Sequence, residues 1–150
     1  MTFFQFEDDF VQSLKCIPMQ VRFKLDTCGV KLKLAHWHTF SISERETLVT
    51  MPCTTADETQ SYKTHLQALV TQHTGAPASE LVVDPDPAWL DANTIPSSTQ
   101  DKATSLDIQI TVNQWRNLSP LQRFALIKLS RPSHENRNFL PAAQEFNLIG

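Results

Sequence analysis

Apolar residues recur every three or four positions along most of the chain, and this spacing predicts short α-helices. One helical face between positions 3 and 15 carries Phe3, Phe6, Phe10 and Leu14. Pro18 suits the first turn of a second helix, and Gly29 suits its C-terminal cap. A third helix is expected between Thr55 and Gly75. Its buried face consists of Tyr62, Leu66, Leu69 and Val70.

Prolines mark the breaks between these elements. Three of them lie within 76–94, which makes this stretch the main connecting segment. We expect Trp89 and Leu90 to pin the segment to the body of the protein. Near the C-terminus the sequence predicts a short helix over 133–140 and a last helix that starts at Pro141.

Two short stretches, 30–34 and 108–112, instead alternate with a period of two. Such alternation is typical of a half-buried strand. We interpret both as extended connectors that could pair with each other as a tiny two-stranded ribbon.

These stretches belong to a longer internal repeat, in which residues 17–49 recur 78 positions later as 95–127 without a gap. The sharpest common element reads Trp-x-x-(Phe/Leu)-Ser-x-x-(Glu/Gln)-Arg-x-x-Leu. Identical residues stand at Ile17 and Ile95, Pro18 and Pro96, Lys24 and Lys102, Trp37 and Trp115, Ser41 and Ser119, Arg45 and Arg123, and Leu48 and Leu126. Internal self-similarity of this kind predicts two related halves.

Each copy contains a recognisable helix start. Ser41 and Glu44 have the spacing of a capping box, and Ser119 and Gln122 keep it. The helix expected over 121–129 is apolar almost all round, which predicts a central buried position. The sequence therefore predicts an all-α fold, a single compact domain over residues 1–150 formed by two duplicated halves.

Composition narrows the class of protein. With 41% hydrophobic and 19% charged residues, the chain is globular rather than disordered. It has no apolar run long enough to span a membrane and no N-terminal pattern of a signal peptide, so we expect a cytoplasmic protein. A net charge of −3 gives no footprint for nucleic acid.

Catalytic and metal-binding patterns are weak. Cys16, Cys28 and Cys53 show no CxxC spacing and are expected to be free thiols. Cys53 precedes a helix start, whose amides would lower the pKa of its thiol if it lies against them, but no orienting acid or oxyanion donor is evident nearby. His36 and His38 point to different faces of a helix. We therefore expect no catalytic, metal-binding or cofactor-binding residue.

Two arginines stand at the same place in each copy, one turn into a helix, where the helix dipole favours acids instead. Their retention suggests a specific partner, either an acid from the other half or the face of a tryptophan. We interpret Trp37, Arg45, Trp115 and Arg123 as structural residues.

Charge is unevenly distributed. Between 80 and 107 there are six acids and one base, and after 107 there are five bases and two acids. The two segments could face each other, or the surface could steer a charged partner. The densest polar cluster consists of Lys128, Arg131, His134, Asn136, Arg137 and Asn138. It could bind an acidic partner or a phosphate of a molybdopterin cofactor, or be a solvated, well-capped turn.

Several strings carry a family resemblance. They include Phe-Glu-Asp-Asp-Phe-Val-Gln-Ser-Leu-Lys-Cys-Ile-Pro-Met-Gln-Val-Arg-Phe-Lys-Leu-Asp at 6–26 and Leu-Gln-Arg-Phe-Ala-Leu-Ile-Lys-Leu-Ser-Arg-Pro at 121–132. Stretches 29–34, 134–139 and 145–146 add to them. Together they resemble the cyanobacterial nitrate reductase-associated protein family. The resemblance implies a small cytoplasmic protein, encoded near nitrate reductase and molybdopterin-synthesis genes and needed for assimilatory nitrate reductase activity. It transfers no catalytic or metal residue.

We therefore predict a non-catalytic accessory protein that supports nitrate reductase by protein contact, through maturation, cofactor loading or docking of an electron donor. One alternative is an enzyme of molybdenum-cofactor or nitrogen metabolism, which a metal or cofactor in the purified protein would favour. The other is a helical interaction module with a different client, which a pull-down from nitrate-grown cells would reveal. The oligomeric state is left open by the sequence.

Overall fold

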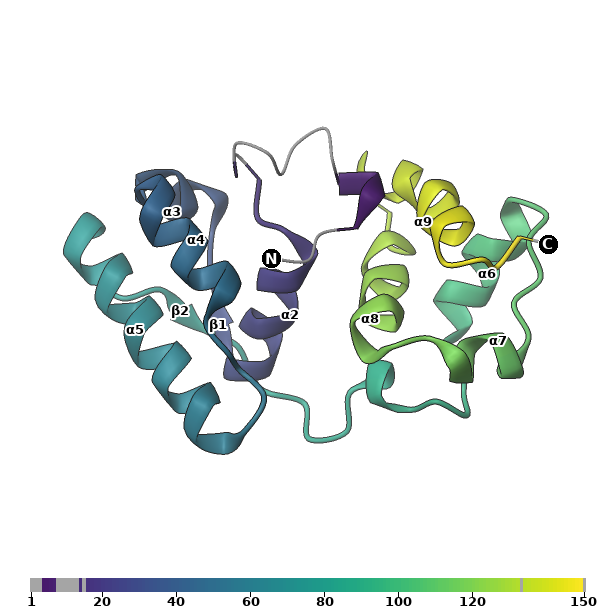
Figure 1. Cartoon of the computed structure of the whole chain (residues 1–150), viewed down its shortest axis with the longest axis horizontal. Coiled ribbons are helices and arrows are strands. Elements are labelled where there is room, and N and C mark those ends of the chain that lie inside the picture. Colours follow the sequence, from purple (N-terminus) through teal and green to yellow (C-terminus); the bar gives the residue numbers. More distant parts are fainter. Residues whose placement is uncertain (1–3, 8–13, 15, 133, 150) are drawn as a thin grey trace. The chain divides into compact units, whose positions relative to one another are not determined.

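The computed structural model of the protein is mostly helical and contains one small sheet (Figure 1), so the all-α prediction is confirmed. The residues that it describes are 4–7, 14, 16–132 and 134–149, without the side chains of His134 and Glu135. The chain divides into two compact units. Unit 1 is the described part of Glu7–Val83, and unit 2 is the described part of Phe4–Phe6 and Asp84–Gly150.

Unit 1 is a helical body with a short ribbon at its margin. In chain order its elements are α2 (Met19–Cys28), β1 (Val30–Lys31), α3 (Leu34–Thr39), α4 (Ile42–Thr50), α5 (Ala56–Thr74) and β2 (Ser79–Glu80). The longest helix, α5, packs against α2 and α3 (Figure 1). Its buried residues are Tyr62, Leu66, Leu69 and Val70, as the periodicity predicts.

Helix α2 begins and ends where its proline and glycine predict. Pro18 is the residue before its first turn, and Gly29 closes it with a left-handed φ of 78°. Pro18 offers no side-chain cap. The buried carboxylate of Glu7 takes that place, because its Oε2 accepts a hydrogen bond from the Met19 amide at 3.0 Å. This cap joins residues 12 positions apart, which no local sequence signal could reveal.

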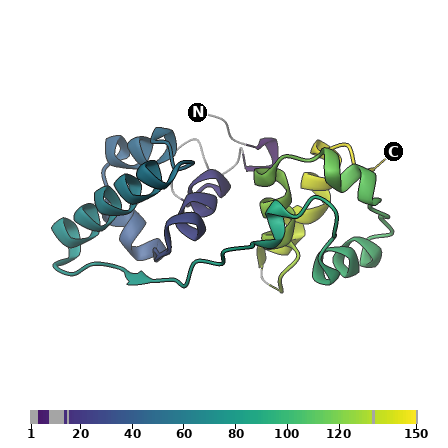
Figure 2. The ribbon, with the colours of Figure 1, turned by 90° about the horizontal axis from the view of Figure 1, so that it is seen from below.

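The small ribbon exists, but its predicted pairing is wrong. Strand β1 pairs antiparallel with β2, with Val30 opposite Glu80. Figure 2 shows β2 as a short teal arrow in the segment that follows α5. Residues 108–111 form a connector instead, and the next helix begins at Val112. The alternation there reflects burial, since Ile108 and Ile110 point into the core of unit 2.

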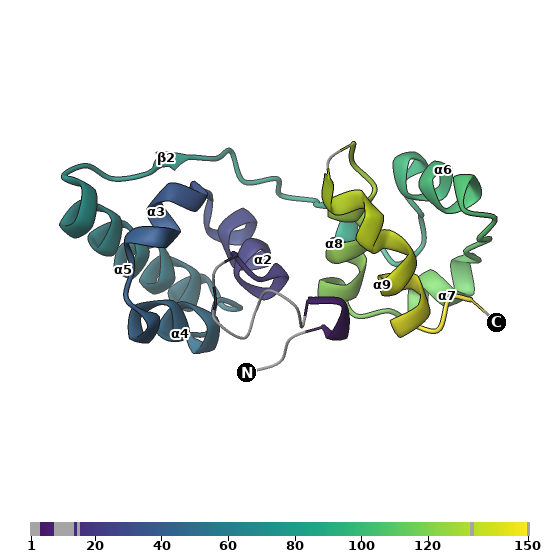
Figure 3. The same cartoon turned by 90° about the horizontal axis from the view of Figure 1, so that it is seen from above.

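Unit 2 is organised around one central helix. Its elements are the first two residues of the 3-10 turn η1 (Gln5–Glu7), then η2 (Ala88–Leu90), α6 (Ser97–Ser105), α7 (Val112–Asn117), α8 (Pro120–Leu129), η3 (His134–Asn138) and α9 (Phe139–Glu145). Helix α8 packs against η2, α6, η3 and α9 (Figure 3). Most of its residues are buried, which confirms the central position expected for it.

The ends of the chain depart from the predicted helices. Of the helix predicted over 3–15, residues 5–7 form a 3-10 turn and Leu14 has a left-handed φ of 52°, whereas 3, 8–13 and 15 lie outside the described residues. Pro141 does not start the last helix but stands third in α9, where its missing N–H has no helical partner to lose. Of the helix expected over 133–140, Ser133 lies outside the described residues, and the rest consists of the 3-10 turn η3 and the start of α9.

The repeated segments of sequence carry the same succession of elements. Helices α3 and α7 begin at Leu34 and Val112, and α4 and α8 begin at Ile42 and Pro120, 78 positions apart in both cases. The capping boxes also match, with the Ser41 hydroxyl accepting from the Glu44 amide and the Ser119 hydroxyl from the Gln122 amide, both at 3.1 Å. A common origin of the two segments stays a prediction.

Candidate functional site

In unit 1 the repeated tryptophan and arginine meet at one main-chain oxygen. Trp37 is fully buried, and its Nε1 donates to the Leu14 carbonyl at 2.7 Å. Arg45 Nη1 donates to the same oxygen at 3.1 Å. Its Nε and Nη2 donate to the carbonyls of Trp37 and His38, and its guanidinium lies 5.9 Å from the centre of the Trp37 ring.

Unit 2 builds a related arrangement around Trp115 and Arg123. Trp115 Nε1 donates to the Asp91 carbonyl at 3.0 Å. Arg123 Nε donates to the Trp89 carbonyl, and its Nη1 to that of Leu118, both at 2.7 Å. Burial lowers the pKa of Arg123, while the nearby charge of Asp91 opposes this change.

These contacts explain how an arginine can stand near the start of its own helix. Arg45 binds carbonyls of α3, and Arg123 binds carbonyls of Trp115 and Leu118 at the end of α7. The end of the preceding helix carries partial negative charge, which favours a cation. The tryptophan face expected as a partner is present at Arg45, but main-chain oxygens are the partners that sequence reasoning missed.

A third group of polar side chains closes the C-terminal end of α4. Lys24 Nζ donates to the carbonyls of Val49 at 2.6 Å and Met51 at 2.7 Å. Tyr62 donates its hydroxyl to the Leu48 carbonyl at 2.8 Å. Burial lowers the pKa of Lys24. These donors bind main-chain oxygens at the C-terminal end of α4 and stabilise that helix. We therefore assign them no catalytic role.

The cysteines are free, as expected, and the pKa of Cys53 is not lowered by the helix start that follows it. Its thiol is buried within 3.9 Å of the Lys24 carbonyl and of Thr59 Oγ1. Burial raises the pKa of Cys53 and outweighs the groups that lower it. Burial also raises the pKa of Cys28 to about 12. Both thiols are therefore poor nucleophiles at neutral pH.

The paired histidines diverge on α3. His36 Nδ1 accepts the Lys33 amide at 3.2 Å, whereas His38 is exposed. Within the described part of the chain, no three side chains of histidine, cysteine, aspartate or glutamate lie close enough to hold one metal ion.

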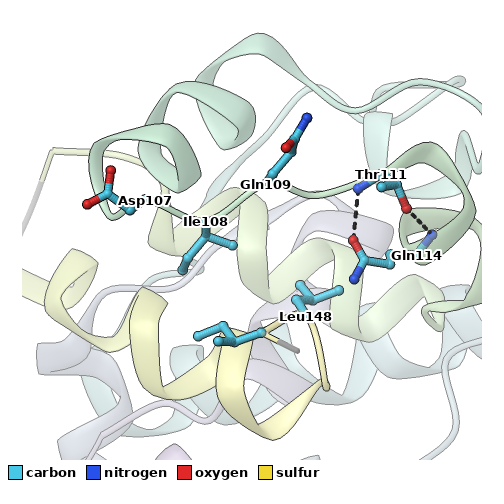
Figure 4. Close-up of a pocket in the computed structure, with 7 residues that line it drawn as sticks. Asp107, Ile108, Gln109, Thr111, Gln114 and Leu148 are labelled. Atoms are coloured by element: carbon cyan, nitrogen blue, oxygen red, sulfur yellow. Dashed lines mark hydrogen bonds between the residues drawn. The ribbon is translucent and has the colours of Figure 1, made fainter.

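Unit 2 also contains an open depression of about 380 Å³ between the α6–α7 connector and the C-terminal residues (Figure 4). Its lining consists of Asp107, Ile108, Gln109, Thr111, Gln114, Leu148 and Ile149. Thr111 and Gln114 bind each other in a capping box, at 2.9 and 3.1 Å. Most of the remaining wall is aliphatic, and its one charged group is the Asp107 carboxylate. We assign it no ligand.

The predicted partner-binding cluster lies where α8 ends and η3 begins. Lys128 is half-buried, with Nζ 5.2 Å from the centre of the Phe124 ring. Arg131 and Arg137 are exposed, and neither forms an ion pair with a side chain that the structure describes. The half-buried members are Asn136 and Asn138. The side chain of His134, the sixth member, lies outside the described residues.

Comparison with known proteins decides the family. Residues 3–146 match the family model described as conserved nitrate reductase-associated protein. The chain belongs to this family. No curated protein and no solved structure matches it. The resemblance to nitrate reductase-associated proteins is thus confirmed, whereas its narrower restriction to cyanobacteria stays a prediction.

Membership of this family suggests which kind of partner the protein has. The family's name points to association with nitrate reductase, which is consistent with an accessory role. Among the described residues, no helix is long and apolar enough to cross a bilayer. Arg45 and Arg123 are held by main-chain oxygens, whereas Arg131 and Arg137 present their guanidinium groups to solvent.

Proposed function

We propose that the protein is a non-catalytic accessory protein of the cytoplasm that supports assimilatory nitrate reductase through direct contact. Family membership supports the choice of partner. The engagement of Lys24, Arg45 and Arg123 in main-chain hydrogen bonds, together with the high pKa of the Cys28 and Cys53 thiols, supports a role without chemistry.

The contact is proposed to use the basic docking surface, defined as Lys128, Arg131, His134, Asn136, Arg137 and Asn138. The observation that carries this proposal is the exposure of Arg131 and Arg137 without an ion pair among the described side chains. A guanidinium can bind a carboxylate through two parallel hydrogen bonds. Two such groups, on the turn after α8 and on η3, suit an acidic segment of nitrate reductase.

Charge reversal tests the surface. The variant Arg131→Glu/Arg137→Glu should lose capture of nitrate reductase while its melting temperature stays close to that of the wild type, because both side chains are exposed. Lys33→Glu/Arg116→Glu is the matched control, since it also replaces two exposed bases and shifts the net charge from −3 to −7 (−3 − 2 × 2). Undiminished capture by the first variant, or an equal loss in the control, would remove the proposal.

A reconstitution experiment distinguishes the possible ways in which the protein supports nitrate reductase. Nitrate reductase activity is followed with and without the protein, together with the molybdenum content of the enzyme. A rise in both quantities identifies cofactor loading. A rise in activity at constant molybdenum identifies electron delivery or stabilisation instead. No change in activity would contradict the accessory role.

A further inference from the structure

The ribbon of unit 1 has an open edge. The Leu81 amide donates to the Gly29 carbonyl at 2.8 Å, so the main chain of Leu81 faces β1. Because neighbouring residues of a strand point their N–H and C=O groups to opposite edges, those of Glu80 and Val82 face away from β1. No described residue forms a hydrogen bond with these outward groups. Figure 3 shows the helices of unit 1 on one side of β2 only.

The side chains along this edge are aliphatic and exposed. Val82 is 99% exposed, and Leu81 and Val83 are exposed as well. Proteins commonly protect an edge strand with lysine, proline or a covering loop. Here the segment 79–83 contains none of these residues, and the first proline after it is Pro85.

Gly29 holds the segment in place. A Cβ at Gly29 would lie 2.8 Å from the Leu81 carbonyl oxygen and 2.8 Å from Val83 Cγ2. The main chain of α2's cap and the segment therefore touch directly. A strand that is already positioned loses little conformational freedom when a partner binds.

We propose that residues 79–83 form a β-augmentation site, which adds an extended segment of a partner protein as a third strand. Main-chain hydrogen bonds to Glu80 and Val82 would supply the contact, as in other complexes formed by strand addition. This inference does not depend on the basic docking surface, which lies in unit 2.

Charge defines the chemistry of the partner. Glu80 is exposed and bonded to Lys63 Nζ at 2.8 Å, and Asp84 follows Val83 directly. A second copy paired antiparallel about Val82 would place Glu80 opposite the Asp84 of its partner, and like charges directly opposite each other destabilise a strand pair. The partner strand is therefore expected to carry an aliphatic residue opposite Val82 and lysine or arginine on both sides of it.

The test is a selection from a random nonapeptide library displayed on phage, with the full-length protein as bait. Enriched peptides should alternate aliphatic residues and carry flanking lysine or arginine. Val82→Pro, which removes one outward N–H, should weaken their binding about five- to tenfold. The control Val82→Thr keeps the N–H and the branched side chain and should bind nearly as well as the wild type.

Other results would overturn the site. These are the absence of enriched peptides, equal binding by Val82→Pro, or enrichment of acidic peptides. Self-association that disappears in Val82→Pro would identify a second copy as the occupant and would also contradict the proposal. Arg131→Glu/Arg137→Glu should bind the selected peptides like the wild type, so failure here is separable from failure of the docking surface.

Discussion

Arg123 Nε donates a hydrogen bond of 2.7 Å to the main-chain oxygen of Trp89, 34 positions earlier in the sequence. The bond fastens the connecting segment to α8, and the Trp89 ring meets the Phe124 ring edge-on with centroids 5.0 Å apart. Trp89 is therefore packed against the body of unit 2, as expected from the sequence. Leu90 is not, because its side chain is 57% exposed.

Arg123→Ala should lower the melting temperature strongly. The substitution removes the guanidinium donor from the carbonyls of Trp89, Trp115 and Leu118, of which Trp115 still accepts the Leu118 amide. An unsatisfied buried polar group costs about 1–3 kcal/mol. A total loss of roughly 3 kcal/mol corresponds to a fall of about 6–12 °C for a chain of this size. Differential scanning calorimetry measures this fall directly.

Lys102→Ala is the control for this prediction. Lys102 lies in the last turn of α6 and is only half-buried, so its loss should change the melting temperature by no more than about 2 °C. Equal melting temperatures of the two variants would refute a structural role for Arg123.

Glu44→Gln should make the free energy of unfolding less dependent on pH under acidic conditions. The Ser41 amide, which donates to Glu44 Oε1 at 2.8 Å, and His73, whose Nε2 lies 2.9 Å from the same oxygen, keep the pKa of Glu44 below its ordinary 4.5. Its stabilisation is therefore complete above pH 4.5 and is lost as the pH falls through the folded-state pKa.

Glutamine keeps the capping box, because Gln122 fills the same role in unit 2. At pH 7 the variant should lose no more than about 1 kcal/mol, as is usual for a polar contact near the surface. Urea unfolding between neutral pH and pH values below 4.5 measures the difference. A parallel decline of Glu44→Gln and the wild type would show that the carboxylate contributes nothing.

Gly29→Ala should destabilise the protein more than Gly75→Ala. Both glycines have a left-handed φ, of 78° and 88°, which costs an alanine roughly 1–2 kcal/mol. A Cβ at Gly29 would also collide with the Leu81 carbonyl oxygen at 2.8 Å, whereas nothing lies within 4 Å at Gly75. The midpoints of urea unfolding should rank wild type, Gly75→Ala and Gly29→Ala in falling order. Equal midpoints would mean that the segment after β2 moves freely away from Gly29.

Tyr62 should report unfolding at alkaline pH. It is the only tyrosine of the chain, so all phenolate absorbance comes from it. Burial raises its pKa well above the ordinary 10.0. Its contribution is present below pH 10 and is lost as the pH rises further, because the unfolded chain gives up the proton first. Phenolate absorbance should therefore appear together with loss of helical circular dichroism.

Tyr62→Phe isolates this effect. Below pH 10 it should cost about 1 kcal/mol through loss of the hydrogen bond to the Leu48 carbonyl. At higher pH its stability should decline less steeply than that of the wild type. Phenolate absorbance of the folded wild-type protein close to pH 10 would contradict the burial of Tyr62.

Local signals in the sequence predicted the helix starts well. Ser41 and Ser119 form the capping boxes expected of them, because each box joins residues only three positions apart. The stop of α2 at Gly29 and that of α5 at Gly75 are equally local. The spacing of apolar residues on α5 likewise identified its buried face. The apolar composition of α8 identified its central position.

Contacts between distant residues were out of reach. Alternation at 108–112 has the same pattern whether a segment pairs or only buries every second side chain, so the partner of β1 could not be chosen. The carbonyls bound by Arg45 and Arg123 belong to any residue type and leave no trace in the sequence. The arginines of the basic docking surface were visible as a cluster, but their exposure depends on how η3 packs against α8 and α9.

The hydrogen bond of 3.0 Å from the Phe6 amide to Glu145 Oε1 has a practical consequence for the design of fusion proteins. Phe4 and Phe6 also pack on Phe146, so segments from the first ten and the last ten residues of the sequence hold each other in unit 2. An affinity tag placed directly beside Phe6 or Glu145 would strain this arrangement. The exposed turn after α5 at Gly75 is the better place for a tag, because it leaves the hydrogen bond between Phe6 and Glu145 undisturbed.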